Sequence, residues 1–171
     1  LASGILLNVE SPREIEILAR ASRELQLTAR VAVRVNPDFE LKSSGMKMGG
    51  GPKQFGVDAE LVPELLKAIE REGLAFEGFH IYSGSQNLKA DSISEAQQKA
   101  IELAIRLAAS ASSPVRVLNI GGGFGIPYFP GDQALDLPRV GANLRGIVAL
   151  AKSALPQAQL VIELGRYLVG E

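Results

Sequence analysis

The chain has 171 residues, of which 46% are apolar, and this is enough for one domain with a packed core. Lysine and arginine number 18 against 19 aspartate and glutamate residues, so the sequence lacks the basic surplus that drives binding to nucleic-acid phosphates. The absence of cysteine excludes disulfides and thiolate metal sites, and a single histidine leaves little for a zinc site, so no metal centre is predicted.

The sequence shows neither a membrane span nor an export signal. No apolar run approaches the roughly 20 residues that a span needs, and the N-terminus lacks the basic start and apolar stretch of a signal peptide. We therefore expect a soluble, cytoplasmic protein. The chain begins at Leu1 rather than at methionine, and Glu171 directly follows a motif-like stretch, so both ends are expected to be cuts in a longer protein.

Five short segments rich in β-formers alternate with helical segments along the chain. Each is a near-continuous apolar run, which is typical of parallel strands covered by helices. The segments are residues 5–9, 29–36, 74–82, 115–120 and 160–164. This rhythm predicts an α/β fold built on a parallel sheet.

Four helices are predicted between these strands. Ser11 to Glu14 has the pattern of a capping box with Pro12 at the first helical position, and residues 92–95 repeat the capping pattern. A third helix runs from about residue 61 to Gly73, which stops it, and a fourth carries apolar residues at helical spacing over residues 140–151.

The residues that could carry chemistry follow the carboxyl ends of successive strands, where parallel sheets build their sites. They are Arg34 and Asn36, His80 to Gln86, Gly121 to Gly125, and Glu163 to Arg166. The two long loops, residues 37–56 and 128–137, are rich in glycine, proline and polar residues, and loops of such length are often functional.

The glycine run from Gly121 to Gly123 permits two interpretations. Without a Cβ, backbone N–H groups can approach an anion such as a phosphate closely, but a tight turn from strand to helix needs glycine as well. A dinucleotide-binding fingerprint is rejected, because the spacing G-x-G-x-x-G counted from Gly121 reaches Ile126.

The polar residues at the other strand ends also permit more than one interpretation. Glu163 and Arg166 form either a surface salt bridge or contacts to different parts of a ligand. His80 is either a buried structural residue or a catalyst. Ser85 lies in a stretch that is either a linker or a phosphate contact. Arg34, on an apolar strand, requires an anionic partner or a hydrogen-bond network.

Taken in order, these motifs resemble those of a known family, the fold-type III pyridoxal-phosphate decarboxylases that include diaminopimelate and ornithine decarboxylases. The stretch from His80 to Gln86 looks closest to members associated with exosortase gene clusters. The motifs that carry the resemblance are Arg34-Val35-Asn36-Pro37, Gln54-Phe55-Gly56, Gly78-Phe79-His80, Ser83-Gly84-Ser85-Gln86, Asn119-Ile120-Gly121-Gly122-Gly123-Phe124-Gly125 and Glu163-Leu164-Gly165-Arg166.

The resemblance implies a fold and a partial domain. Residues 1–171 would form the C-terminal part, about strands 4 to 8, of a (β/α)8 TIM-type barrel of the alanine-racemase-like class. The first barrel units and a C-terminal β domain would lie outside the chain. The lysine that forms the Schiff base would lie outside it as well, so no catalytic residue is expected within this sequence.

The resemblance also implies residue roles around pyridoxal 5′-phosphate. The phosphate would be held by Gly121 to Gly123 with Ser85 and Arg166, and Glu163 would contact the pyridine nitrogen. The full expected cofactor-binding set is Arg34, His80, Tyr82, Ser85, Gly121, Gly122, Gly123, Glu163, Gly165 and Arg166.

Three positions depart from the family pattern. Leu164 replaces a proline, which leaves the neighbouring polar roles intact. Tyr82 stands where the ring-stacking histidine usually lies, while His80 matches an earlier histidine, so which of the two stacks on the cofactor stays open. The role of Gln54-Phe55-Gly56 is open too.

The implied activity is the decarboxylation of an amino acid. A carboxylate at Glu163 favours a protonated pyridine ring, whereas racemases of the same barrel class present an arginine there. The alternatives are such a racemase and a non-catalytic module that binds pyridoxal phosphate. A homodimer is expected for the longer protein, and the open edges of a partial barrel predict that the isolated chain associates.

Overall fold

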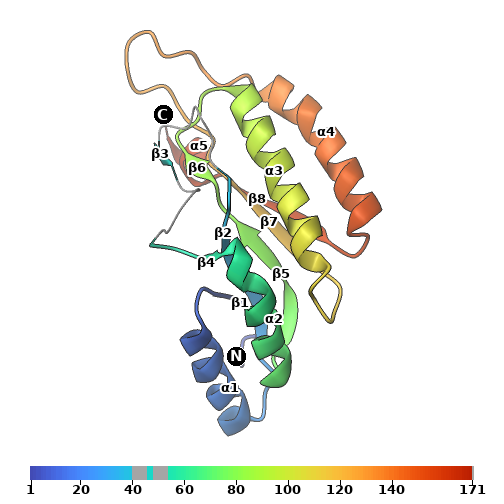
Figure 1. Cartoon of the computed structure of the whole chain (residues 1–171). Coiled ribbons are helices and arrows are strands. Elements are labelled where there is room, and N and C mark those ends of the chain that lie inside the picture. The colour runs from blue at the N-terminus through green and yellow to red at the C-terminus, as the bar shows by residue number, and fades with distance from the viewer. Residues whose placement is uncertain (40–45, 48–53, 171) are drawn as a thin grey trace.

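A computed structural model describes residues 1–39, 46–47 and 54–170 of the chain (Figure 1). The five predicted strands all form, close to their predicted positions. They are β1 (Leu6–Val9), β2 (Arg30–Asn36), β5 (Ala75–Ile81), β7 (Val117–Gly122) and β8 (Gln159–Glu163). The predicted α/β fold with a parallel sheet is therefore confirmed.

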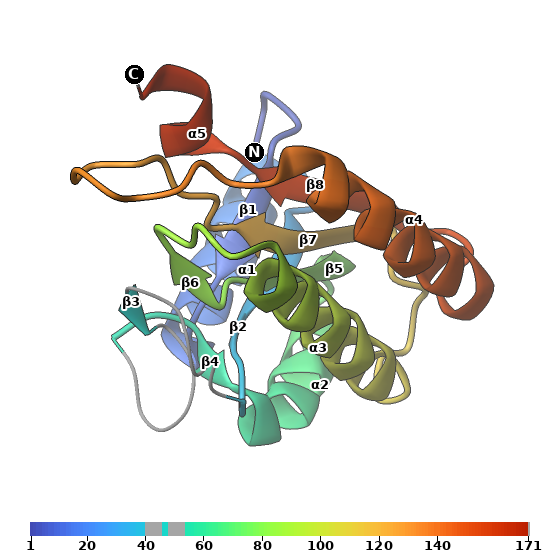
Figure 2. The same ribbon diagram turned by 90° about the horizontal axis from the view of Figure 1, so that it is seen from above.

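The strands lie side by side in chain order, β1-β2-β5-β7-β8, and every neighbouring pair is parallel. Because parallel crossovers are right-handed, a sheet that grows in one direction carries its connecting helices on one face. Helices α2, α3 and α4 lie along one side of the sheet in both views (Figures 1 and 2). The order has no switch point, which agrees with the rejection of a dinucleotide-binding fold.

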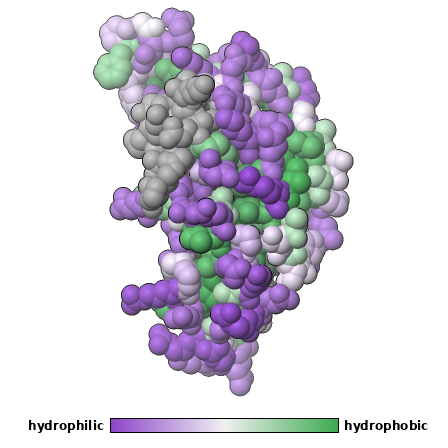
Figure 3. Space-filling view, in the orientation of Figure 1, coloured by the Kyte–Doolittle hydropathy of each residue, from purple (hydrophilic) through white to green (hydrophobic). Residues whose placement is uncertain are grey.

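Helices form at all four predicted segments, and a fifth, short helix that was not predicted follows the last strand. Polar residues cover most of the face seen in Figure 3, with smaller apolar areas between them, as expected for helices that turn their polar sides to water. The helices are α1 (Pro12–Leu25), α2 (Val62–Arg71) after a 3-10 turn (Ala59–Leu61), α3 (Ala90–Ala108), α4 (Leu137–Ala154) and the short α5 (Gly165–Val169). Among the residues described, no helix is long and apolar enough to cross a bilayer.

One of the two predicted helix starts is confirmed. Ser11 caps α1, and its hydroxyl accepts a hydrogen bond from the backbone N–H of Glu14 at 3.3 Å. The carboxylate of Glu14 accepts a hydrogen bond from the backbone N–H of Glu10 at 2.5 Å. In a capping box the donor would be the N–H of the N-cap residue, Ser11, one position later.

The second predicted start, at residues 92–95, is wrong. Helix α3 begins at Ala90, and the Ser94 hydroxyl donates to the carbonyl of Ala90 at 2.9 Å from inside the helix. The chain turns earlier because the side-chain oxygen of Asn87 accepts from the N–H of Lys89 at 2.9 Å. A serine inside a helix can bond back to a carbonyl as readily as it caps a helix start, which explains the misplacement.

The predicted loop over residues 37–56 contains a short strand. Strand β3 (Met46–Lys47) pairs antiparallel with β6 (Gly84–Ser85) in the loop after β5. Strand β4 (Val57–Asp58) extends the pairing at the end of β2. The backbone that follows β2 is thereby joined to the backbone that follows β5, at the edge of the sheet where the candidate residues gather.

Candidate functional site

A cavity of about 490 Å³ lies at the carboxyl ends of the strands. Every predicted cofactor-binding residue except Gly121 and Gly122 lines it, together with Gln86, Phe124 and Leu164. Its size falls within the range of small-molecule sites. The fold thus brings together side chains that lie more than a hundred positions apart, from Arg34 to Arg166.

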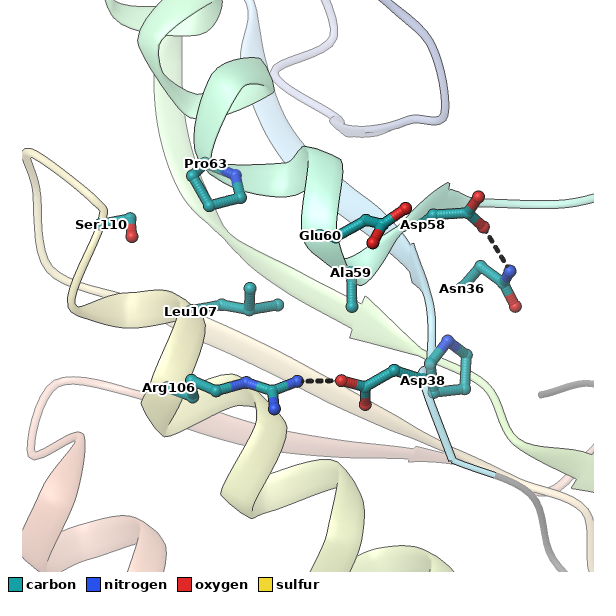
Figure 4. Close-up of a pocket in the computed structure, with 10 residues that line it drawn as sticks. Asn36, Asp38, Asp58, Ala59, Glu60, Pro63, Arg106, Leu107 and Ser110 are labelled. Carbon is teal, nitrogen blue, oxygen red and sulfur yellow. Dashed lines mark hydrogen bonds and ion pairs between the residues drawn. The ribbon is translucent and has the colours of Figure 1, made fainter. Parts of the chain in front are cut away.

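A larger cavity of about 580 Å³ lies between α2 and α3 (Figure 4). Two pairs of its polar groups contact each other: Arg106 forms an ion pair with Asp38, and the Asn36 amide donates to Asp58 at 2.6 Å. None of the predicted cofactor-binding residues lines it. We therefore place the candidate site in the smaller cavity, where the strand ends converge.

Close backbone packing requires glycine at two of the three positions at the end of β7. A Cβ on Gly122 would lie 1.6 Å from the carbonyl oxygen of Glu163, and one on Gly123 would lie 2.1 Å from that of Gly84. Gly121 donates its N–H to the side-chain oxygen of Asn119 at 2.9 Å, and Gly123 lines the cavity. The turn therefore requires glycine, as one interpretation had it, and the close approach of an anion to Gly123 stays a prediction.

Arg166 is held by a residue from another segment. Its Nη1 donates to the side-chain oxygen of Gln86 at 3.0 Å, and its guanidinium lies 5.6 Å from the centre of the Tyr128 ring. Gln86 also donates from Nε2 to the carbonyl of Ile126 at 2.5 Å. One side chain thus ties the loop after β5 to the loop after β7 and to α5.

Arg34 has the anionic partner that the sequence required. Its Nη1 lies 3.0 Å from a carboxylate oxygen of Glu10, and its guanidinium lies 4.8 Å from the centre of the Phe55 ring. The other carboxylate oxygen of Glu10 accepts from the N–H of Gly56 at 2.7 Å. The Gln54-Phe55-Gly56 stretch, whose role the sequence left open, therefore packs around this ion pair.

His80 is buried, with 7% of its surface exposed. Its Nδ1 lies 3.3 Å from the side-chain nitrogen of Asn8, and its Nε2 lies 3.5 Å from a carboxylate oxygen of Glu163. An amide nitrogen can only donate, so Nδ1 accepts and the ring proton sits on Nε2, facing Glu163. Burial lowers the pKa of His80, with help from Arg34, against the opposing charge of Glu163. The ring is therefore neutral near pH 7.

Glu163 stands at the mouth of β8, and its side chain is 49% exposed. One carboxylate oxygen accepts from the Asn119 amide at 2.8 Å, and the other faces His80. Glu163 and Arg166 consequently have different partners, which favours the ligand-contact interpretation over a salt bridge between them. Tyr82 borders the same cavity beside Gly121.

Sequence reasoning missed three residues of this network: Asn8, Glu10 and Asn119. Two of them carried a signal. Asn8 and Asn119 are single polar residues within otherwise apolar strands, the same signal that singled out Arg34. Glu10 directly follows β1, at the edge where the other site residues lie.

The described lysines lie away from the cavity or outside the large sheet. Lys67, Lys99 and Lys152 are on helices, Lys89 caps α3, and none of these four lines the cavity. Lys47 lies in β3 rather than in a loop as predicted, and Lys42 and Lys53 fall outside the described residues. Over the same described part of the chain, no group of residues could hold a metal ion.

The family model for the pyridoxal-binding domain of pyridoxal-dependent decarboxylases matches residues 2–170. The L-glutamyl-[BtrI acyl-carrier protein] decarboxylase of Niallia circulans is 36% identical over 172 residues, which cover 99% of this chain and 40% of that protein. The diaminopimelate decarboxylase of Aquifex aeolicus is 33% identical, over 97% of this chain and 39% of that protein.

A solved structure shows the same arrangement. Diaminopimelate decarboxylase from M. jannaschii in complex with L-lysine superimposes with a TM-score of 0.75 at 26% identity, over 92% of this chain and 37% of that chain. The chain therefore spans about two fifths of the length of the curated relatives that it matches.

Proposed function

Since the chain belongs to the pyridoxal-dependent decarboxylases, through their pyridoxal-binding domain, we propose that the protein decarboxylates an amino acid with pyridoxal 5′-phosphate as cofactor. The observation that carries the proposal is the separation of charge in one cavity. A guanidinium, a hydroxyl and a glycine lie among its lining residues, together with a carboxylate that is held by a different partner from the guanidinium. A phosphorylated pyridine ring needs these two kinds of contact.

The lining residues fit the cofactor in kind. Arg166, Ser85 and Gly123 would hold the phosphate, because they offer a cation, a hydroxyl and backbone without a Cβ in the way. Gly121 and Gly122 would shape the turn behind that end. Gly165 lies between Glu163 and Arg166 and has no atoms within 4 Å of its Cβ position, so it leaves space at the entrance.

Glu163 would act on the pyridine nitrogen. When bound, the cofactor accepts the electron pair that remains on the substrate after carbon dioxide departs. A carboxylate beside the ring nitrogen holds a proton there and so strengthens this property. The Asn119 amide orients this carboxylate, which supports decarboxylation over racemisation.

Two aromatic side chains could contact the cofactor ring. Tyr82 and His80 both line the cavity, but His80 is more buried and both of its ring nitrogens face side chains, Asn8 and Glu163. We assign the stacking role to Tyr82 and keep His80 as a contact of Glu163. Arg34 lines the same cavity, paired with Glu10.

We further propose that residues 1–171 are part of a (β/α)8 barrel, contributing about strands 4 to 8. The consecutive parallel order and the helices on one face support this, because a barrel repeats that step eight times. The remaining barrel units, the reactive lysine and a β domain would belong to other parts of a longer protein. A cytoplasmic homodimer that acts on an amino acid completes the proposal.

Titration of the purified protein with pyridoxal 5′-phosphate, followed by absorbance, tests the cofactor site. We expect Arg166→Met to weaken binding roughly tenfold to hundredfold, because a charged hydrogen bond to phosphate is lost. Arg145→Met, an equal change on the exposed side of α4, should leave binding unchanged. Equal binding by both variants would contradict the assignment. Release of carbon dioxide from a panel of amino acids by the longer protein, rather than racemisation, identifies the reaction.

A further inference from the structure

The carboxylate of Glu163 accepts a hydrogen bond from one uncharged donor, and a neutral imidazole ring lies beside it. The amide nitrogen of Asn119 lies 2.8 Å from one oxygen, and Nε2 of His80 lies 3.5 Å from the other. An uncharged donor orients a carboxylate and leaves its negative charge in place, whereas a guanidinium would neutralise it in a bidentate pair. The surroundings of Glu163 thus preserve the charge that a protonated ring nitrogen would meet.

The two arginines of the cavity are each held by another acceptor. Arg34 pairs with Glu10 at 3.0 Å, and Arg166 donates to Gln86 at 3.0 Å. Both guanidiniums line the same cavity as Glu163, so these partners decide whether a cation reaches it. Glu10 and Gln86 therefore keep the positive and negative ends of the site apart.

Asn119 is fixed at both ends of its amide. Its oxygen accepts from the N–H of Gly121 at 2.9 Å, which leaves its nitrogen directed at Glu163. The contact joins Gly121, near the end of β7, to the carboxylate at the end of β8. A change at either end is thus passed to the other through one side chain.

We propose that Asn119 is the positioning residue of Glu163: it aims that carboxylate at the pyridine nitrogen and couples it to the glycine turn. The inference rests on the proposed function and goes further, because it assigns a role to a residue that would not itself touch the cofactor. Asn119 would set the affinity for the ring nitrogen and leave the affinity for the phosphate largely unaltered.

A pair of ligands isolates this contribution. Pyridoxine 5′-phosphate has the ring nitrogen and lacks an aldehyde, so it binds without covalent chemistry, and its 1-deaza analogue carries C–H in place of the nitrogen. The ratio of the two dissociation constants, measured by calorimetry on the purified protein, reports the nitrogen contact alone. We expect the unaltered protein to prefer the first ligand by about tenfold or more, as a charged hydrogen bond would give.

Asn119→Leu should reduce this preference to within about threefold, because the donor that orients Glu163 is lost. In a Glu163→Gln background the same substitution should change the ratio no further, since the carboxylate through which Asn119 acts is already gone. Asn143→Leu, which removes an exposed amide from α4, is the matched control and should keep the full preference. Asn119→Ala repeats the measurement if leucine disturbs folding.

An unchanged ratio in both Asn119 variants would overturn the inference while leaving the cofactor site standing. A further loss of preference from Asn119→Leu in the Glu163→Gln background would also overturn it, because Asn119 would then act independently of the carboxylate. Failure of the unaltered protein to bind either ligand would overturn the proposed function itself.

Discussion

His80 lies where burial and charge act on one ring in opposite directions. Burial lowers its pKa, and Arg34 acts in the same sense, whereas Glu163 raises it. Because the chain has a single histidine, its ring protons give one isolated signal in a proton NMR titration. We expect a midpoint below the usual value of about 6.5. Glu163→Gln should lower the midpoint further, and a midpoint above the usual value would contradict this account.

The same shift predicts how stability depends on pH. Since the folded state lowers the pKa of His80, the unfolded chain takes up a proton at a higher pH than the folded chain does. This contribution to the free energy of unfolding is therefore complete above pH 6.5 or so, and it is lost as the pH falls from there through the folded-state pKa. His80→Gln should remove this part of the pH dependence in urea denaturation.

Individual site residues could be predicted from the sequence where chemistry and position coincide. Arg34, Glu163 and Arg166 are charged residues in or shortly after apolar strands, and all three line the cavity. Their partners could not be named, because Glu10 and Gln86 reach them across loops whose approach depends on the paired sheet. Sequence spacing does not encode such contacts.

The turn after β7 shows how tightly neighbouring elements meet. Gly123 has a φ of +74°, and a Cβ there would lie 2.1 Å from the carbonyl oxygen of Gly84. We expect Gly123→Ala to lower the free energy of unfolding by more than about 2 kcal/mol, because both the backbone conformation and the contact become strained. Gly146 lies on the exposed side of α4 with open space at its Cβ position.

Gly146→Ala is therefore the matched control, and it should raise stability by about 0.5–1 kcal/mol through helix propensity. Urea denaturation followed by circular dichroism measures both variants. If Gly123→Ala proved as harmless as Gly146→Ala, the close crossing of β7 with the loop after β5 would be refuted.

The longer elements could be predicted because their signals are redundant. Apolar runs mark the strands, Pro12 marks the start of α1, and Gly73 marks the end of α2. The two-residue strands β3, β4 and β6 could not be predicted, since segments so short carry no periodicity and form only where the sheet brings them together. Helix α3 was misplaced at its start because serines suit caps and helix interiors alike.

At the scale of the molecule, the sheet ends in two outer strands. Over the described residues, β1 and β8 each pair with one neighbour only. Unpaired parallel edges are templates for association, so the 171-residue chain should self-associate as its concentration rises. Analytical ultracentrifugation would measure this, and a concentration-independent monomer would contradict it.

A charged substitution on an outer strand distinguishes association through the strand edge from nonspecific association through other surfaces. Val161 lies in β8, opposite Asn119 of β7. Val161→Lys should weaken association, since charged residues on an edge strand oppose pairing. Ala142→Lys adds the same charge on the exposed side of α4 and should leave association as it was.

The cavity draws its lining from positions as distant as Arg34 and Arg166, on the ends of β2, β5, β7 and β8. A molecule held there would contact segments that share no local structure and meet only when the sheet is complete. Its binding energy is then available only to the assembled chain, so free ligand shifts the folding equilibrium toward that state. The melting temperature of such a protein would rise with the concentration of free cofactor.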